Sequence, residues 1–208
     1  MIICIMGESG AGKTTSMRNL NSKETVYIDC DKKGLSWKGW REKYVKDVNY
    51  YATDFAQNVM QVLEWCNKTK NIKNVVVDTL NGIMVADEMR RRKEKGYDKW
   101  QDLAAAVYEI VDYALTMRED INVIFVCHTQ TDHDDNGFMF TRIKTSGRKL
   151  DKITLESKFT TVLLAKCIDG KYVFETQSNF STAKSPMGAL EPIVESDITK
   201  VIEALKEY

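Results

Sequence analysis

Apolar and polar positions follow two periods along the chain, and their alternation predicts an α/β fold. Short apolar runs rich in β-branched residues recur at 2–6, 25–29, 74–78 and 122–127. Between them, apolar residues return every three or four positions, as on one face of a helix. Strands that alternate with helices form βαβ units with parallel strands. The pattern therefore predicts a three-layer α/β domain with a mostly parallel central sheet.

Helices are predicted between these strands and at the end of the chain. The expected ranges are 13–20, 54–70, 82–95, 98–118 and a last helix from Ser196 or Asp197 to Tyr208. Residues 98–118 give the clearest pattern, because their apolar side chains share one face. Ser196 or Asp197 can cap the last helix.

Antiparallel strands are predicted in the C-terminal third. Polar residues 129–137 predict a turn before a strand at 138–143. Apolar runs at 159–167 and 171–176 flank Ile168-Asp169-Gly170, which is a hairpin signal. Because the chain has no repeat, low-complexity tract or linker, one domain over residues 1–208 is expected, with a C-terminal antiparallel extension.

Composition narrows the classes of function. Thirty Lys and Arg balance thirty Asp and Glu, so no global field draws the chain onto nucleic acid or anionic lipid. Apolar residues make up 43%, which excludes a disordered chain. Five cysteines without a CxxC pair predict reduced core thiols. Since no run approaches the ~18 uncharged residues that cross a bilayer, we expect a cytoplasmic protein with no membrane contact.

The segment from Gly7 to Thr14 satisfies the phosphate-binding pattern GxxxxGK[ST] between a predicted strand and a predicted helix. Its glycines allow backbone angles that turn N–H groups inward and, with the helix N-terminus, form an anion site. Lys13 is expected to reach the β- and γ-phosphates and the Thr14 hydroxyl to ligate Mg²⁺, which predicts binding of ATP with Mg²⁺. The candidate nucleotide-binding residues are Gly7, Glu8, Ser9, Gly10, Ala11, Gly12, Lys13, Thr14 and Thr15.

Asp78 is the candidate second residue for the metal. It closes the 74–78 strand, which we expect to neighbour the first strand and so bring the carboxylate near Thr14. A helix cap or a turn is the alternative role for an Asp at this place. Thr79 follows where a Glu could supply a catalytic base, so that base must come from elsewhere.

Polar groups also close the second and fourth strands, at the edge where open α/β sheets bind ligands. Asp29 and Asp31 lie two residues apart, and one of them can orient the attacking water. His128 and Gln130 are candidates for sensing the γ-phosphate. The alternative is that His128 is an ordinary hydrogen-bonded histidine of the core or surface.

Together these motifs resemble the RecA-type core. The resemblance rests on the phosphate loop, YIDCD at 27–31, NVVVDT at 74–79 and VIFVCHTQ at 123–130. More narrowly, the chain is similar to compact phage-encoded nucleotide-binding proteins associated with single-strand annealing and recombination. It implies a RecA-like ATPase that works on single-stranded DNA, in the host cell cytoplasm if a phage encodes it.

The resemblance also implies residue roles. RecA relatives have a water-positioning Glu two residues beyond the Asp of the second strand, and Asp31 stands there, one methylene shorter. A late lysine that reaches the γ-phosphate across a subunit interface is matched by Lys184, for which an exposed loop lysine is the alternative. Filament contacts through an N-terminal helix and strand are not implied, because this sequence starts at the phosphate-loop strand. The predicted catalytic residues are Lys13, Asp31, Asp78, His128 and Gln130.

Basic residues gather in two segments. The first, at 90–95, lies on a predicted helix that also carries Asp87, Glu88 and Glu94, which favours a solvated helix face over a nucleic-acid contact. The second follows the 129–137 turn and would contact the phosphates of a single strand in a salt-sensitive way. Phe138 and Phe140 could stack on bases or belong to a core face. The candidate nucleic-acid residues are Arg142, Lys144, Arg148, Lys149 and Lys152.

Two metal motifs are rejected. Residues 132–137 fit the first half of an EF-hand loop, but the twelfth position is Ile143 rather than the required Glu. His128 and His133 have no third ligand at zinc spacing.

The favoured function is a Mg²⁺-dependent ATPase that acts on single-stranded DNA in phage-type recombination or replication. A homo-oligomer, or a single-strand-binding or annealing partner protein, would raise its DNA affinity. One alternative is a small-molecule or nucleotide kinase with Arg90–Arg92 as a lid. The other is a nucleotide-dependent switch or assembly factor with very slow hydrolysis, because Asp31 replaces Glu.

Overall fold

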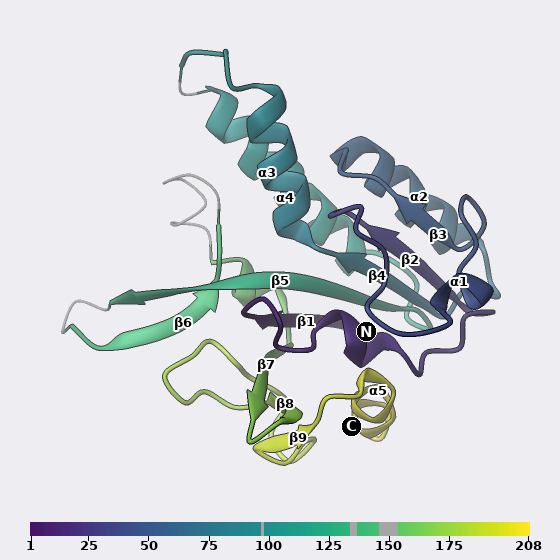
Figure 1. The fold of residues 1–208 in the computed structure, drawn as a ribbon, viewed down its shortest axis with the longest axis vertical. Coiled ribbons are helices and arrows are strands. Elements are labelled where there is room, and N and C mark those ends of the chain that lie inside the picture. Colours follow the sequence, from purple (N-terminus) through teal and green to yellow (C-terminus); the bar gives the residue numbers. More distant parts are fainter. Residues whose placement is uncertain (97, 134–136, 146–153) are drawn as a thin grey trace.

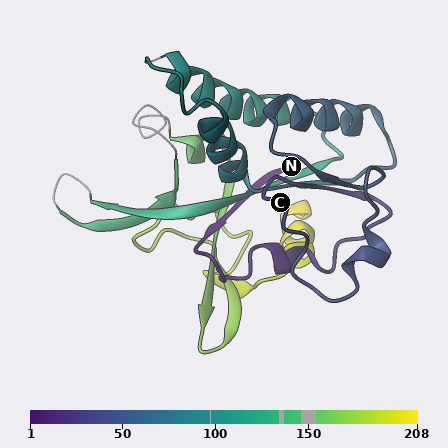
Figure 2. The same ribbon diagram turned by 45° about the horizontal axis from the view of Figure 1, so that its top comes forward.

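The protein is an α/β domain in three layers (Figure 1). A computed structural model describes residues 1–96, 98–133, 137–145 and 154–208. Figure 2 shows the blue and teal helices on one side of the sheet and the yellow C-terminal helix on the other. The N-terminus begins at the central strand, where the Met1 ammonium donates to the Ile121 carbonyl over 2.7 Å.

The sheet is parallel in its larger part and antiparallel at one end. Its strand order is β3-β2-β4-β5-β1-β7-β8-β9, and β6 pairs with the outer half of β5. The predicted fold class is confirmed by this sheet and the helices on both its faces. The strands are β1 Ile2–Gly7, β2 Thr25–Asp29, β3 Tyr50–Ala52, β4 Asn74–Asp78, β5 Asn122–His133, β6 Met139–Ile143, β7 Thr161–Ile168, β8 Lys171–Glu175 and β9 Ile193–Glu195.

The strand that ends in Asp78 does not neighbour β1, so that expectation is wrong. β5 lies between them and is hydrogen-bonded in parallel to both. The run from Asn122 to Cys127 is buried throughout, and an apolar run without alternation suits a strand covered on both faces. Burial therefore favours β5 for the position beside β1.

Successive side chains of the central strands point to opposite faces of the sheet, and each face has its own apolar core. Cys4 and Met6 of β1 face one core, and Ile3 and Ile5 face the other. Three helices pack on the first face, and the last helix packs on the second together with the turn after the phosphate loop. The helices are α1 Trp40–Lys43, α2 Ala56–Lys68, α3 Leu80–Arg90, α4 Asp98–Leu115 and α5 Ile198–Lys206, and the 3₁₀ turns are η1 Thr14–Met17 and η3 Leu155–Lys158.

The helix predicted over 13–20 is reduced to η1. The Ser16 hydroxyl donates to the Lys13 carbonyl over 2.6 Å, and the backbone continues with i to i−3 bonds at Arg18 and Leu20. Side chains that bond nearby backbone compete with a regular helix. The chain after the phosphate loop therefore follows tight turns and not a full α-helix.

The turn predicted over 129–137 is also wrong in part, because β5 continues to His133. Residues 129–133 pair with 139–143 in an antiparallel ladder, which we call the β5–β6 arm. This arm extends away from the body of the domain (Figure 1). Its polar residues need no apolar face there, so the polar composition that indicated a turn is compatible with a strand.

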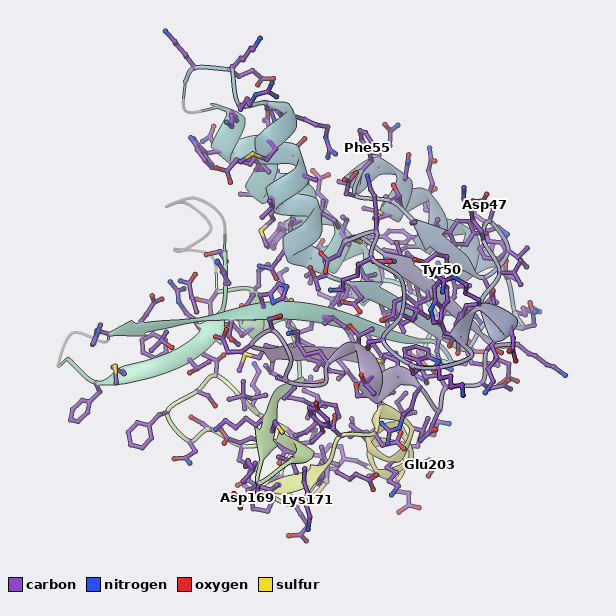
Figure 3. All side chains as sticks on the ribbon, viewed as in Figure 1. Asp47, Tyr50, Phe55, Asp169, Lys171 and Glu203 are labelled. Atoms are coloured by element: carbon purple, nitrogen blue, oxygen red, sulfur yellow. The ribbon has the colours of Figure 1, made fainter. Side chains whose placement is uncertain are left out.

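The C-terminal hairpin was predicted correctly. β7 and β8 pair in antiparallel register from Leu164↔Glu175 to Ile168↔Lys171. Asp169 (φ 50°) and Gly170 (φ 76°) form its turn, near the labels Asp169 and Lys171 in Figure 3. Positive φ at both central residues is the requirement of a type I′ hairpin turn, which Asp-Gly meets.

Candidate functional site

The phosphate loop leaves β1 at a close approach between backbones. A Cβ on Gly7 would lie 2.8 Å from the carbonyl oxygen of Ala165 on β7. Gly10 (φ 83°) and Gly12 (φ 85°) have left-handed backbone conformations. A Cβ on Gly12 would lie 2.7 Å from Cδ1 of Tyr172, whose ring covers the loop from β8. Glycine is therefore required at these positions for steric reasons.

Lys13 extends back along the inside of the loop. Its Nζ donates to the carbonyl oxygens of Gly7 (2.7 Å) and Glu8 (2.8 Å), and the residue is only 7% exposed. Burial lowers the pKa of Lys13, and the negative charge of Asp78 opposes that shift. The ammonium is thus held at the loop by neutral carbonyls and the charge of one nearby carboxylate.

Thr14 and Asp78 meet although their strands are not neighbours. Thr14 Oγ1 donates to Asp78 Oδ2 over 2.7 Å, and the hydroxyl of Tyr27 donates to the same oxygen over 2.5 Å. Asp78 is 2% exposed, and its Oδ1 is buried without a hydrogen-bond partner among the described residues. Burial raises the pKa of Asp78, although the two hydroxyls act against it. A buried carboxylate oxygen with no partner, beside a threonine hydroxyl, fits a hard divalent cation.

The two acids after β2 have different surroundings. Asp29 is buried and accepts from the Tyr50 hydroxyl (2.6 Å) and the Gly34 amide (2.7 Å), so it fixes the fold of the loop after β2. Asp31 is more open: it accepts from Thr79 Oγ1 (3.1 Å) and forms an ion pair with Lys33 Nζ (2.5 Å).

His128 lies at the phosphate loop, but Gln130 does not reach it. The His128 amide donates to Oδ1 of Asn81 over 2.7 Å. Burial lowers the pKa of His128, and the positive charge of Lys13 lowers it further. Gln130 lies two residues out on the β5–β6 arm, where Nε2 donates to Asp132 (3.0 Å) and Oε1 accepts from the Thr145 amide (3.3 Å).

Lys13, Thr14, Asp78 and His128 border a cavity of about 340 Å³, which we call the P-loop cleft, and its described lining includes neither Asp31 nor Gln130. It is lined by Ser9, Gly10, Gly12, Lys13, Thr14, Thr15, Lys33, Ser36, Asp78, His128 and Tyr172. Sequence reasoning missed Lys33, Ser36 and Tyr172, which belong to no motif. Lys33 stands two residues from Asp31, and that spacing was the only available signal.

A second, larger cavity of about 630 Å³ adjoins the P-loop cleft and shares Gly12, Thr15 and Tyr172 with it. It lies between η1 and the strands β8 and β9. The remaining lining residues include Arg18, Lys171, Val173, Ile193, Val194, Glu195 and Ser196. The site thus consists of a small charged cleft and a wider, more apolar one beside it.

Comparison with known families agrees with this geometry. Residues 1–186 match the family AAA_24, described as an AAA domain. The chain belongs to this AAA domain family. The AAA domain match includes the whole phosphate loop, Asp78 and His128, so the protein is a P-loop protein of a nucleotide-binding family.

Solved structures also match this AAA domain protein. One is the KaiC-like protein PH0186 from the hyperthermophilic archaeon Pyrococcus horikoshii OT3, with 15% sequence identity and a TM-score of 0.49. The alignment covers 83% of this chain and 77% of that one. No curated protein matches the chain.

The basic residues of the AAA domain protein differ in their surroundings. Arg142 is hydrogen-bonded to Asp132 within the β5–β6 arm, whereas Lys144 has an exposed side chain. Arg148, Lys149 and Lys152 lie outside the described residues. The nucleic-acid role of all five therefore stays a prediction.

Lys184 and the cluster at 90–95 lie apart from the P-loop cleft. The Lys184 backbone forms a bridge with Val162 of β7, with N···O distances of 2.9 and 2.8 Å. Arg90 pairs with Asp54 over 3.0 Å, and Arg91 pairs with Asp102 over 2.8 Å. The ion pairs agree with a solvated helix face for the cluster.

The described residues lack two kinds of feature. They contain no group of three or more His, Cys, Asp and Glu side chains arranged to hold a metal ion. None of their helices is long and apolar enough to cross a membrane. A cation at Asp78 would consequently depend on Thr14 and on oxygens from outside the protein.

Proposed function

We propose that this AAA domain protein is a Mg²⁺-dependent ATPase whose turnover is coupled to single-stranded DNA in phage-type recombination or replication. One observation carries the ATPase part: the Thr14 hydroxyl and the unpartnered, buried carboxylate oxygen of Asp78 lie together at the mouth of a glycine loop that holds a lysine. A cation and a polyphosphate would satisfy these groups at once.

Each loop residue has a defined task in this proposal. The backbone N–H groups of residues 7–14 bind the phosphates, and Lys13 exchanges its carbonyl partners for β- and γ-phosphate oxygens. Thr14 and Asp78 would hold a magnesium ion, which would supply positive charge to the β- and γ-phosphates. The hydroxyl of Tyr27 fixes the Asp78 carboxylate from inside the sheet.

Hydrolysis requires a water in line with the bond to be broken. Asp31 orients this water and accepts its proton, while the water oxygen bonds to the γ-phosphorus. The bond to the bridging oxygen breaks, ADP leaves with the electron pair, and Asp31 later releases the proton to solvent. The products are ADP, inorganic phosphate and a proton. The Thr79 hydroxyl holds the other oxygen of Asp31 and fixes its direction.

The nucleoside would occupy the larger cavity. That cavity adjoins the P-loop cleft at Gly12 and Thr15, and the Tyr172 ring borders both. A ribose and base fit its volume of about 630 Å³, and its apolar residues from β8 and β9 suit a planar ring.

The DNA part of the proposal is supported by the start of the second basic segment. The Lys144 amide donates to the His128 carbonyl over 2.7 Å, so Lys144 lies next to a residue that lines the P-loop cleft. Asn81 bonds both sides of this junction, accepting from the His128 amide and donating to the Lys144 carbonyl. A strand of DNA bound along the segment would lie close to the γ-phosphate. Trans action by Lys184, self-association and a single-strand-binding or annealing partner remain predictions.

The kinase alternative receives no support from its expected lid. Arg90 and Arg91 are ion-paired with Asp54 and Asp102, and the described lining of the P-loop cleft includes neither arginine. The slow-switch alternative is favoured by one observation, the ion pair that Lys33 makes with Asp31.

The test is ATP turnover with and without single-stranded DNA, for the wild type and Lys13→Ala. Lys68→Ala, which changes an exposed lysine at the end of α2, is the matched control. We expect DNA-stimulated phosphate release in the wild type and the control, and none above background in Lys13→Ala. A phosphorylated acceptor instead of free phosphate would indicate a kinase, and equal rates in all assays would refute the proposal.

A further inference from the structure

Lys33 faces the P-loop cleft from the loop after β2, outside every predicted motif. It lines the cleft together with Lys13, Thr14 and His128. Its Nζ lies 2.5 Å from Oδ2 of Asp31, and its side chain is half exposed. The cleft therefore contains two lysines that reach it from opposite sides, one from the phosphate loop and one from the β2 loop.

Electrostatic effects on three groups agree with the position of Lys33 in this cleft. Its positive charge contributes to the lowered pKa of Lys13 and to that of His128. Burial lowers the pKa of Lys33 itself, but the hydrogen bond to Asp31 and the charge of Asp78 outweigh it and raise the pKa. Lys33 is thus a full cation at neutral pH, within range of both carboxylates of the site.

The loop that carries Lys33 is held firmly on either side of it. The Cys30 amide donates to the Asp78 carbonyl over 2.6 Å, and the Gly34 amide donates to Asp29 over 2.7 Å. Gly34 has a positive φ of 82° and lies against the Trp40 ring. Because the backbone is fixed at both ends, the side chain is the part of Lys33 that can change partners.

The same ion pair occupies the carboxylate that the proposed function assigns to the water. Asp31 already accepts from Thr79 through Oδ1, so the bond from Lys33 fills the remaining oxygen. While the ammonium group is paired with this oxygen, it competes with a water molecule for the same acceptor. Asp31 becomes available only if Lys33 finds another anion, and the terminal phosphate of a nucleoside triphosphate is the anion expected in this cleft.

We infer that Lys33 binds the terminal phosphate in cis, and that its transfer from Asp31 to this phosphate releases the carboxylate to orient the attacking water. This inference rests on the proposed function. It gives the site a γ-phosphate cation from the same subunit, in the role that an arginine finger has in other nucleotide hydrolases. It also couples the presence of a third phosphate to the activation of the water.

Lys32 provides a matched control. It is the neighbouring residue, is similarly exposed and is also paired with a carboxylate, Asp54, over 2.6 Å. It does not line the P-loop cleft among the described residues, and it borders the cavity between β3 and α2 instead. A general loss of loop charge would affect Lys32→Gln and Lys33→Gln alike.

The experiment measures the dissociation constants of ATP and ADP with Mg²⁺, and the rate of phosphate release, in the wild type, Lys33→Gln, Lys33→Arg and Lys32→Gln. A charged hydrogen bond to the γ-phosphate predicts that Lys33→Gln binds ATP about 10-fold more weakly, with ADP binding changed less than about 2-fold. Turnover at saturating ATP should fall at least about 10-fold, because the transition state loses a cation even though Asp31 is no longer held in the ion pair. Lys33→Arg should recover part of the ATP preference, and Lys32→Gln should match the wild type.

The outcomes separate this inference from the proposed function. If the wild type binds and hydrolyses ATP but Lys33→Gln retains its preference for ATP over ADP, the inference is wrong while the ATPase stands. Equal weakening of ATP and ADP would also overturn it, because that result indicates a structural role for the ion pair. If the wild type binds no nucleotide, the proposed function itself fails.

Discussion

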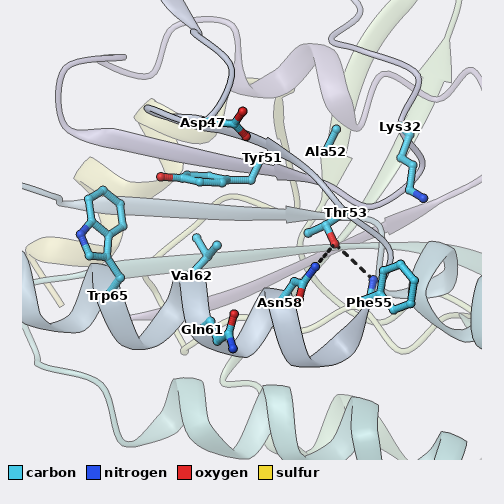
Figure 4. A pocket seen from close by; sticks show the side chains of 10 residues that line it. All are labelled: Lys32, Asp47, Tyr51, Ala52, Thr53, Phe55, Asn58, Gln61, Val62 and Trp65. Carbon is cyan, nitrogen blue, oxygen red and sulfur yellow. Dashed lines mark hydrogen bonds between the residues drawn. The ribbon is translucent and has the colours of Figure 1, made fainter.

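Two cavities of the protein differ both in volume and in the hydrogen bonding of the polar side chains that line them. The P-loop cleft measures about 340 Å³, whereas a groove of about 600 Å³ lies between β3 and α2. We call the second the edge groove, because β3 is the edge strand of the sheet. Figure 4 shows its side chains, with Tyr51 and Trp65 at one end and Phe55 at the other.

The polar groups of the two cavities are satisfied to different degrees. In the edge groove, Lys32 pairs with Asp54, and Thr53 accepts from the Asn58 amide over 3.2 Å and the Phe55 N–H over 3.4 Å. In the P-loop cleft, a buried oxygen of Asp78 has no partner among the described residues. Burial of an unpaired charge is costly, so such a group indicates a ligand more strongly than cavity volume does.

Asp78→Asn should produce the largest effect, because it removes the group that most distinguishes the two cavities. We expect Mg²⁺-dependent ATP turnover to fall by about 100-fold or more. Folding should be retained, since burial already raises the pKa of Asp78 and the neutral amide avoids the cost of the buried charge. Phosphate release and thermal unfolding measure the two properties, and turnover at the wild-type rate would contradict the assignment.

Gly12→Ala should have the next largest effect, through the shape of the loop. The new Cβ would have φ 85° and lie 2.7 Å from the Tyr172 ring. We expect a stability loss of about 1–2 kcal/mol from the left-handed backbone, plus weaker ATP binding from misdirected N–H groups. Chemical denaturation and nucleotide titration check this. In the double variant with Tyr172→Ala, only the part due to the clash should be recovered, and full recovery would show that the backbone conformation is unimportant.

The decrease in the free energy of unfolding at acid pH should depend on His128. Burial and the charge of Lys13 lower its pKa below the ordinary value of 6.5, so protonation is less favourable in the folded protein than in the unfolded chain. The stability that this provides is complete above that ordinary value and is lost as the pH falls through the lowered pKa. Between about pH 7 and 5, the free energy of unfolding should fall less in His128→Gln than in the wild type. Identical slopes would place the imidazole in bulk solvent.

Trp65→Ala in the edge groove should have the smallest effect on nucleotides. ATP affinity and turnover should change less than about 2-fold, because the described linings of the groove and the P-loop cleft share no residue. Stability should fall by about 1 kcal/mol through loss of the edge contact between Trp65 and Tyr51, whose ring centroids are 6.3 Å apart. Nucleotide titration would show whether the groove is independent of the P-loop cleft, and a large loss of ATP affinity would mean that it is not.

Sequence patterns predicted the elements that have a long period or strong turn chemistry. β2 and β4 have the expected bounds, and the Asp169-Gly170 hairpin and the Asp197 cap of α5 are present. β3, β9 and α1 were not predicted, because each has three or four residues and is too short for a period to show. The expected position of β4 beside β1 was wrong, because the sequence alone does not determine which apolar run forms the neighbouring strand.

The part of the site that lies in one short segment was predictable, because the local sequence determines its geometry. The glycine loop, Lys13 and Thr14 lie in one segment, and the Asp78 contact followed from the metal chemistry even though the strand order did not. Lys33 and Tyr172 reach the cleft only through the fold of the β2 loop and of the β7–β8 hairpin. Gln130 was expected at the cleft, but the extension of β5 into the arm places its side chain on Asp132.

β5 lies between β1, which leads into the phosphate loop, and β4, which ends at Asp78, and it continues without a break into the arm. His128 is the seventh of its twelve residues, so the outer five extend about 17 Å from the cleft at the rise of an antiparallel strand. Within β5, no loop or hinge separates His133 from His128. A force applied at His133 would therefore be transmitted along one continuous strand to His128 at the P-loop cleft.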